Sequence, residues 1–217
     1  MKIKICGMRE PQNIKDVAAL QPDYMGYIFY ARSPRFAGKV TNHETLLTKT
    51  DNSIKTAVFV DEQIPEICRV QRIYQFGAVQ LHGNETSEFC KNLRDQLPSG
   101  VQIFRAFGMA DEFDFSKLIT FQPFVDFFLF DTSTIEKGGS GKTFDWAILK
   151  NYHLDTPYWL SGGIGIEEIE QVLKTGFLSD TLYGIDLNSR LETEPGHKDI
   201  SKVASIMKFR DACLNNE

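Results

Sequence analysis

The sequence predicts an α/β fold, a (β/α)8 TIM barrel that forms a single domain over residues 1–217, and three observations support this. Eight short apolar segments rich in β-branched and aromatic residues alternate with amphipathic segments. Most of the apolar segments are continuous, as in parallel strands that are covered on both faces. No linker rich in glycine, serine or proline divides the chain. Strict alternation of strands and helices implies a parallel sheet. Eight strands favour a closed barrel over an open doubly wound sheet, although a chain of 217 residues is short for a barrel.

The expected strands are short, as is usual for a barrel of this length. In chain order they are Ile3–Cys6, Tyr24–Phe29, Thr56–Val60, Ala78–Leu81, Val101–Phe107, Val125–Asp131, Tyr158–Ser161 and Leu182–Asp186.

Helices are expected where apolar residues recur three and four positions apart. Pro11 is placed to begin the first of them. The apolar faces are formed by Ile14, Val17 and Ala18, by Phe89, Cys90, Leu93 and Leu97, by Ile166, Ile169, Val172 and Leu173, and by Ile200, Val203, Ala204 and Met207. Two further helices, near residues 42–49 and 111–119, have a weaker pattern. About eight helices are expected in all.

Composition and charge exclude several classes of protein. The net charge is −5 and no block of Lys and Arg occurs, so a nucleic-acid partner is not expected. The first residues lack the apolar run of a signal peptide, and no stretch approaches the roughly 18 apolar residues of a membrane span. Four scattered cysteines without CxxC spacing indicate neither a zinc site nor a disulfide framework. We therefore expect a cytoplasmic protein that does not bind membranes.

Polar residues and glycines concentrate at the ends of the predicted strands, where barrel enzymes carry their chemistry. Cys6 ends the first strand, and it is either a buried small side chain or a thiolate base or nucleophile. Asp131 closes the apolar run Phe127–Phe130, where a carboxylate costs stability unless it is paired or used. A loop-bracing or helix-capping role for Asp131 is the alternative.

Two glycine-bearing segments suggest a phosphate site, since glycine lets backbone N–H groups approach an anion closely. Residues 138–143 (Gly-Gly-Ser-Gly-Lys-Thr) resemble a nucleotide-binding P-loop, but Glu136 stands where that motif needs glycine. A mobile active-site loop fits this segment better, with a plain flexible loop as the alternative. Gly162 and Gly163 follow the seventh strand, and residues 186–189 follow the eighth, where barrels often hold phosphate.

An ordered set of motifs resembles phosphoribosylanthranilate isomerase. The motifs run from residue 2 to about residue 200, and the ordered set is far more specific than any one of them. They are Lys4-Ile5-Cys6-Gly7-Met8, residues 26–30 with Ser33-Pro34-Arg35, Val58-Phe59-Val60, residues 79–83, Asp131-Thr132, residues 138–146, Leu160-Ser161-Gly162-Gly163 and residues 195–199.

The resemblance implies an Amadori rearrangement of N-(5-phosphoribosyl)anthranilate without a metal or organic cofactor. An acid protonates the furanose ring oxygen and opens the ring, and a base removes the proton at C2. By the match, Asp131 is the general acid and Cys6 the general base. These roles require a carboxyl pKa above about 3.9 and a thiol pKa below about 8.5.

The resemblance also assigns binding roles, and it implies a small phosphorylated substrate as the partner. Arg35 is expected to bind the anthranilate carboxylate, a task that suits the planar guanidinium with its parallel N–H donors. Without the resemblance, Arg35 would be interpreted as an ordinary charged residue of a loop. Asp186 and His82 are expected to line the pocket. The phosphate is expected at the backbone of Gly139, Ser140, Gly141, Gly162, Gly163, Asn188 and Ser189. We expect a monomer rather than a homodimer.

The chain departs from the family pattern after the eighth strand. Where the family has Asp-Val-Ser-Ser-Gly-Val-Glu, this chain has Asp186-Leu187-Asn188-Ser189-Arg190-Leu191-Glu192. The change to Asn188 keeps hydrogen-bonding ability. The change from glycine to Arg190 adds a cation beside the expected phosphate, which either strengthens binding or points to solvent.

Three alternatives remain open at this point. The first is a related phosphate-binding barrel enzyme. The histidine-pathway isomerase uses two aspartates where this chain has Cys6 and Asp131. Indole-glycerol-phosphate synthase needs a catalytic lysine, and no buried strand here ends in one. A catalytically dead barrel that binds phosphorylated ligands is the second. A thiol redox protein is the third, disfavoured because Cys6 has no partner nearby in the sequence.

Overall fold

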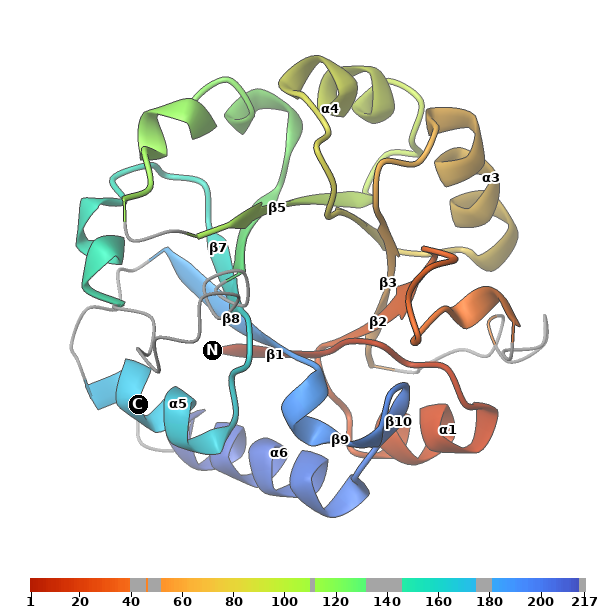
Figure 1. Cartoon of the computed structure of the whole chain (residues 1–217), viewed down its shortest axis with the longest axis vertical. Coiled ribbons are helices and arrows are strands. Elements are labelled where there is room, and N and C mark those ends of the chain that lie inside the picture. The colour runs from red at the N-terminus through yellow and green to blue at the C-terminus, as the bar shows by residue number, and fades with distance from the viewer. Residues whose placement is uncertain (40–45, 47–51, 110–111, 132–145, 175–180, 215–217) are drawn as a thin grey trace.

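The eight parallel strands close into a barrel in the order β1 to β8, with β1 paired to β8, which confirms the predicted fold class (Figure 1). The computed structural model describes residues 1–39, 46, 52–109, 112–131, 146–174 and 181–214. The strands are β1 (Lys2–Ile5), β2 (Tyr24–Ile28), β3 (Ile54–Phe59), β4 (Ala78–Leu81), β5 (Gln102–Gly108), β6 (Phe127–Asp131), β7 (Tyr158–Ser161) and β8 (Leu182–Leu187). That residues 1–217 form one domain stays a prediction.

The predicted strands agree with the observed ones to within two residues at each end. The β4 and β7 bounds are those expected, and Cys6 lies one residue beyond β1. The Cys6 N–H still donates to the Leu187 carbonyl at 2.8 Å, so the β1–β8 ladder extends to the thiol residue.

Helices surround the barrel on its outside (Figure 1). In the described part of the chain the α-helices are α1 (Pro11–Ala19), α3 (Ile64–Tyr74), α4 (Ser87–Arg94), α5 (Ile166–Lys174) and α6 (Ile200–Leu214). Pro11 occupies the first turn of α1, as predicted. In α4 the Thr86 hydroxyl accepts from the Phe89 N–H at 3.1 Å, which satisfies an otherwise unpaired donor of the first turn.

Part of the helix prediction is wrong. In place of a helix near residues 111–119, the described residues form the 3-10 helices η2 (Phe115–Leu118) and η3 (Gln122–Phe124). Residues three apart share a side of a 3-10 helix, and Phe115 and Leu118 are both buried in this way. The segment between β6 and β7 also contains a 3-10 helix, η5 (Trp146–Asn151). The helix expected near 42–49 lies outside the described residues, apart from Leu46.

A small hairpin that the strand pattern did not predict follows β8. After the 3-10 helix η6 (Ser189–Leu191), strands β9 (Glu192–Glu194) and β10 (His197–Lys198) pair in antiparallel fashion. Gly196 makes the turn with a φ of 86°, a conformation that favours glycine. The hairpin inserts between the barrel and α6, and it carries two buried charged side chains toward the site.

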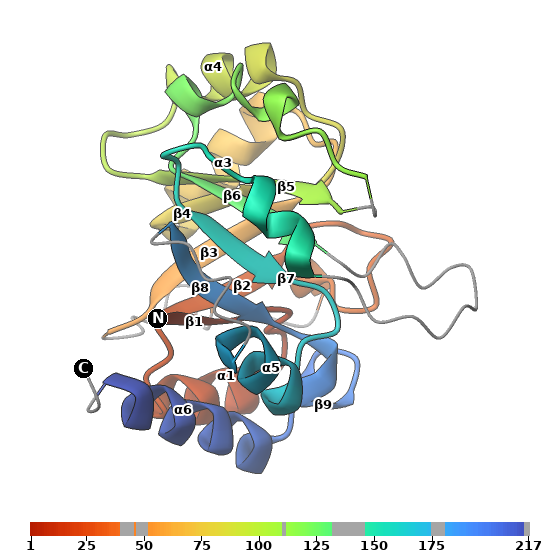
Figure 2. The same cartoon turned by 90° about the vertical axis from the view of Figure 1, so that its left-hand side faces the viewer.

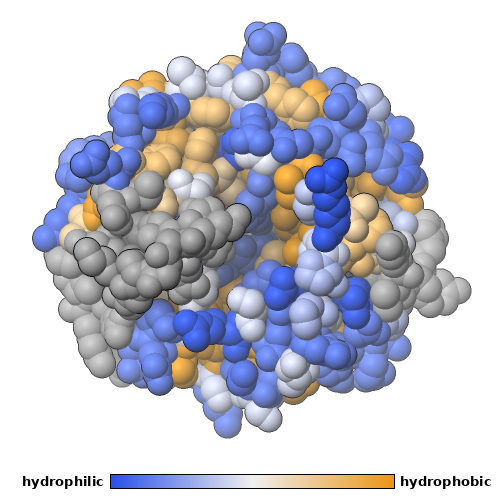
Figure 3. Space-filling view, viewed as in Figure 1, coloured by the Kyte–Doolittle hydropathy of each residue, from blue (hydrophilic) through white to orange (hydrophobic). Residues whose placement is uncertain are grey.

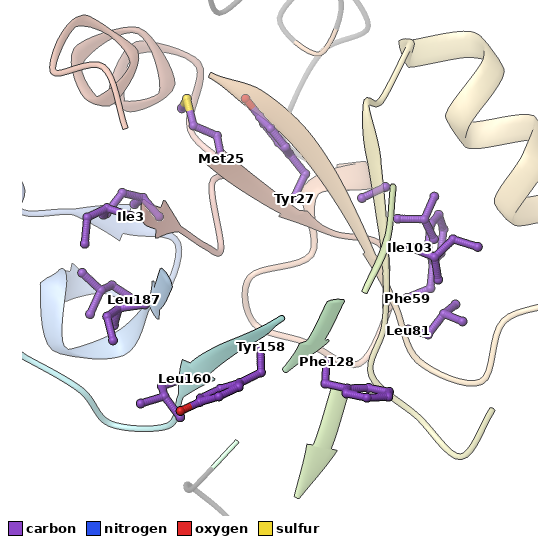
Figure 4. Close-up of a cluster of buried hydrophobic side chains, with 14 of the residues drawn as sticks. Ile3, Met25, Tyr27, Phe59, Leu81, Ile103, Phe128, Tyr158, Leu160 and Leu187 are labelled. Carbon is purple, nitrogen blue, oxygen red and sulfur yellow. The ribbon is translucent and has the colours of Figure 1, made fainter. Parts of the chain in front are cut away.

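Alternate residues of each strand face opposite sides of the barrel wall. Figure 4 shows the residues that face outward from the strands, where the helices cover them. Inside the barrel, Tyr24, Phe104, Phe127 and Trp159 form an aromatic cluster, with the Tyr24 and Trp159 rings 5.0 Å apart. These side chains fill the end of the barrel where the strands begin.

Polar side chains occupy the barrel interior above the aromatic cluster. Lys4 and Gln80 alternate with the outward-facing residues of β1 and β4, and Asp186 does so on β8. All strands of the barrel run in one direction (Figure 2). The alternation of side chains along parallel strands therefore places these residues in the interior, just below the strands' carboxyl ends. None of the described helices is long and apolar enough to cross a membrane.

Candidate active site

A cavity of about 210 Å³ opens at the carboxyl ends of the strands. Figure 3 shows this face hollowed at its centre, with hydrophilic residues in the hollow. The lining comes mainly from the ends of β6, β7 and β8, and it consists of Arg35, Asp131, Ser161, Gly162, Gly163, Ile164, Asp186, Asn188, Ser189 and Arg190. The structure thus brings together most of the predicted site residues it describes. Gly139, Ser140 and Gly141 lie outside the described residues.

Asp131 ends β6 and takes part in a line of three side chains. Gln80 Nε2 lies 2.9 Å from His82 Nδ1, and His82 Nε2 lies 3.1 Å from Asp131 Oδ2. When the Gln80 amide donates to Nδ1, the proton of neutral His82 sits on Nε2 and is donated to Asp131. Gln80 is buried on the strand that leads to His82, so it fixes the orientation of the imidazole from below.

Cys6 lies within the barrel mouth beside a buried ion pair. The Lys4 ammonium contacts the Asp186 carboxylate at 2.8 Å, and both side chains are buried. Cys6 is one of the groups that act electrostatically on Lys4. On the other side the thiol packs on Gly26 of β2, where an added Cβ would lie only 2.7 Å from Sγ. Cys6 therefore lies between the Lys4 ammonium and the backbone of Gly26.

Burial is the largest influence on the pKa of the Cys6 thiol. Burial raises the pKa of Cys6, and the Lys4 ammonium opposes this rise without cancelling it. Burial also works to lower the pKa of Lys4, but Asp186 and Cys6 together outweigh it, and the pKa is raised. The expected lowering of the Cys6 pKa is therefore not found, and a base at this position depends on the neighbouring cation.

Arg35 lies at the cavity edge and forms an ion pair with Glu192 of the hairpin. Its Nε contacts Glu192 Oε1 at 2.8 Å, and its Nη2 contacts Oε2 at 2.6 Å. Lys198, fully buried, also donates to Glu192, at 2.9 Å. Gly7 has a φ of 79°, and an added Cβ there would lie 2.9 Å from Arg35 Cδ. These contacts hold the guanidinium in one orientation, with Nη1 unpaired among the described residues.

The Glu192 carboxylate makes stability depend on pH. Burial works to raise the pKa of Glu192, but the hydrogen bonds from Arg35 and Lys198 outweigh it and lower the pKa to about 2. A depressed pKa stabilises the fold above the unfolded value of roughly 4.3 and stops doing so as the pH falls toward 2. We expect this group to account for about 3 kcal/mol of the loss in unfolding free energy over that range.

Urea unfolding of the wild type and of Glu192→Gln, from pH 6 to pH 2, checks this expectation. The variant is expected to lose less stability on acidification than the wild type. Glu194→Gln serves as the control, because Glu194 is an exposed residue of the same strand. Equal pH dependence in Glu192→Gln and the wild type would show that Glu192 does not keep its charge in the folded chain.

The glycine turn after β7, where an anion site is predicted, lies in the cavity lining. Gly162 has a φ of 102° and Gly163 a φ of 64°, values that a side chain would strain. An added Cβ at Gly163 would meet no atom within 4 Å, so the space beside it is open. Arg190 Nε donates to the Gly163 carbonyl at 3.0 Å, which places this cation at the cavity edge instead of far out in solvent.

Several residues of the site carried no predicted role. Lys4 and Gln80 stand two residues before Cys6 and His82, on the same face of their strands. That spacing was visible in the sequence, and a charged or amide side chain inside a buried strand is the signal that finds them. Glu192 and Lys198 could not be found this way, because the hairpin that carries them has no strand-like apolar pattern.

Comparisons with known proteins agree with this geometry. The family model of N-(5'-phosphoribosyl)anthranilate isomerase matches residues 3–209. The isomerase of that name from Parabacteroides distasonis is 43% identical over 209 residues, covering 96% of this chain and 92% of the relative. The crystal structure of phosphoribosyl anthranilate isomerase from Thermotoga maritima superposes with a TM-score of 0.79 at 28% identity, covering 98% of this chain and 99% of that one.

A further solved structure holds a ligand. A phosphoribosyl anthranilate isomerase in complex with reduced 1-(o-carboxyphenylamino)-1-deoxyribulose 5-phosphate superposes with a TM-score of 0.75 at 24% identity, covering 96% of this chain and 97% of that one. Because the family model and a relative above 40% identity each span nearly the whole chain, the chain belongs to the N-(5'-phosphoribosyl)anthranilate isomerase family.

Proposed function

We propose that this chain converts N-(5'-phosphoribosyl)anthranilate to 1-(2-carboxyphenylamino)-1-deoxyribulose 5-phosphate, a step of tryptophan biosynthesis. The observation that carries the proposal is one cavity whose lining includes the Asp131 carboxyl group, the glycine turn 162–163 and the end of β8. The thiol of Cys6 lies beside the same cavity, next to Asp186 of its lining. The cavity therefore offers an acid, a base and an anion site together.

Asp131 serves as the general acid. In a protonated carboxyl group, Oδ2 accepts from His82 Nε2 and Oδ1 carries the proton to the ring oxygen of the substrate. The hydrogen bond between His82 and Oδ2 thus orients the acid. Cys6 then removes the proton at C2, and the electrons of the C–H bond move toward the ring-opened imine to give an enolamine.

The binding roles follow from unpaired donors and acceptors. Asp186 Oδ1 is buried and has no partner among the described residues, so it is suited to accept a hydrogen bond from a substrate hydroxyl. Arg35 Nη1 is suited to the anthranilate carboxylate, since Glu192 engages the other two nitrogens. Gly162, Gly163, Asn188 and Ser189 surround the expected phosphate.

The test is the loss of anthranilate-type fluorescence when purified protein acts on freshly made phosphoribosylanthranilate. We expect the fluorescence to decay at a rate proportional to protein concentration. The Asp131→Asn protein, purified in the same way, controls for contaminating isomerase from the host. A wild-type sample that decays no faster than this control contradicts the proposed function.

Arg190→Ala is expected to raise KM about fivefold and to leave kcat unchanged. The side chain is 58% exposed and pairs weakly with Glu168 at 3.8 Å, so its contribution to phosphate binding stays within the roughly 1 kcal/mol of surface charge pairs. Lys208→Ala removes the same charge from the exposed side of α6 and should leave KM unchanged. An unchanged KM in Arg190→Ala rules out the binding role.

A monomer in the cytoplasm is part of the proposal. A cytoplasmic site suits a mechanism that depends on the free thiol of Cys6, because thiols stay reduced there. Size-exclusion chromatography coupled to light scattering tests the monomer.

A further inference from the structure

Lys4 is a buried cation to which the proposed function gives no task. Its side chain has no exposed surface, and its ammonium is tied to Asp186 across the β1–β8 pairing, where the two residues are direct register partners. Burying an ion pair usually stabilises a fold no better than a well-packed apolar pair. The position of this pair in the barrel mouth therefore calls for an explanation other than stability.

The geometry links Lys4 to the thiol. Lys4 and Cys6 stand two residues apart on β1 and face the same side of the barrel wall. The ammonium acts electrostatically on the thiol, while Asp186 holds the ammonium from the neighbouring strand at 2.8 Å. Gly26 closes the other side, since even a Cβ there would overlap the sulfur. The sulfur therefore lies on the same face of β1 as the Lys4–Asp186 pair and is packed against Gly26.

We propose that Lys4 is a positioning residue for the isomerase reaction: held by Asp186, its ammonium donates a hydrogen bond to the Cys6 sulfur and stabilises the thiolate that takes the substrate proton. The inference rests on the proposed function, and it names the group that makes the buried thiol usable as a base. The transfer is a proton transfer alone. The C2–H bond breaks, an S–H bond forms, and Lys4 keeps its own proton throughout.

The charges around the sulfur support this role. Among the described residues, four charged groups act on Cys6: Lys4 on β1, Asp186 on β8, Lys198 on β10 and Arg35 after β2. Burial raises the pKa of the thiol and Asp186 adds to the rise, while Lys4 is the strongest opposing influence and Lys198 a weaker one. Without Lys4, a thiolate would face the Asp186 carboxylate with no cation between them.

The first readout is the titration of the thiol itself. The far-ultraviolet absorbance of the thiolate is followed against pH, and the signal of Cys6→Ser is subtracted to isolate Cys6. We expect Lys4→Met to raise the midpoint by at least about one pH unit, a tenfold loss of thiolate at a given pH. Lys4→Arg, which keeps the charge, is expected to restore most of the shift. An unmoved midpoint in folded Lys4→Met overturns the proposal.

Two further variants control for misfolding and for a general effect of removing a lysine. Lys4→Met leaves the Asp186 carboxylate buried without its cation, so the double variant Lys4→Met/Asp186→Asn removes both charges and is measured if the single variant does not fold. Lys2→Met is the matched control, because Lys2 begins the same strand but is half exposed and pairs with Asp23. Its thiol midpoint should equal that of the wild type, and a shift there would overturn the assignment to Lys4.

The second readout is the pH dependence of kcat/KM with phosphoribosylanthranilate. One limb of the pH profile reports the ionisation of the base. In Lys4→Met we expect this limb to move to higher pH by the same amount as the thiol midpoint. At neutral pH, kcat is expected to fall at least about tenfold, while KM stays nearly the same. A moved midpoint with an unmoved limb overturns the proposal, because the thiolate then does not limit turnover. If the wild type shows no turnover, the proposed function fails, while the thiol titration still decides whether Lys4 stabilises the thiolate.

Discussion

Replacing Asp131 by asparagine is expected to lower kcat by about 10²–10⁴, the contribution of a single proton-transfer group. The amide keeps the size of the side chain and an oxygen that accepts from His82 Nε2, so the cavity keeps its shape. What the variant loses is the proton that the substrate's ring oxygen needs. Steady-state kinetics by fluorescence should therefore show a large fall in kcat with KM nearly unchanged.

Asp126→Asn is the matched control for this variant. Asp126 stands directly before β6, at the opposite end of the strand from Asp131. It accepts from the Ile103 N–H and pairs with Arg94, so its loss is expected to lower stability and leave kcat intact. A kcat for Asp131→Asn within tenfold of the wild type would mean that Asp131 only braces the loop.

Cys6→Ser is expected to lower kcat by a similar factor of about 10²–10⁴. A serine hydroxyl holds its proton far more tightly than a thiol does, so the Lys4 ammonium cannot make it a useful base at neutral pH. The change removes little volume, and the packing on Gly26 should persist. The measurement is again kcat and KM, together with the melting temperature to show that the fold is kept.

Cys90→Ser separates the chemistry of Cys6 from the effect of burial. Cys90 is as buried as Cys6, but it lies on α4 outside the barrel wall. We expect its replacement to cost stability and to leave kcat unchanged. A Cys6→Ser protein that turned over at the wild-type rate would show that the Cys6 thiol is only a packing group.

The strands could be predicted because burial on both faces leaves a continuous apolar signature in the sequence. The segment near residues 111–119 could not, because Phe113, Phe115 and Leu118 are spaced for burial in either an α-helix or a tighter turn. The ring contacts of Phe113 with Phe107, and of Phe115 with Phe130, favour the turn that is observed. Such contacts join residues on different elements and do not show in local periodicity.

The candidate site could be predicted in its outermost layer only. Cys6, Asp131 and the glycine turn 162–163 follow strands whose ends are visible in the sequence. The layer below depends on the closure of the barrel, which sets Lys4 beside Asp186. The partner of Arg35, Glu192, depends on a hairpin without a strand-like pattern.

The Lys4–Asp186 pair also has a consequence for the nascent chain. The two residues are 182 positions apart, so at roughly 5–20 residues per second the ribosome adds Asp186 about 10 to 40 s after Lys4. Throughout that time the first strand carries an ammonium whose acidic partner, Asp186, has not been made. The barrel cannot close around it, and the thiol cannot meet its final surroundings, until the eighth strand has left the exit tunnel. The reactive centre is thus completed only when the strand that carries Asp186 pairs with the strand that carries Lys4 and Cys6.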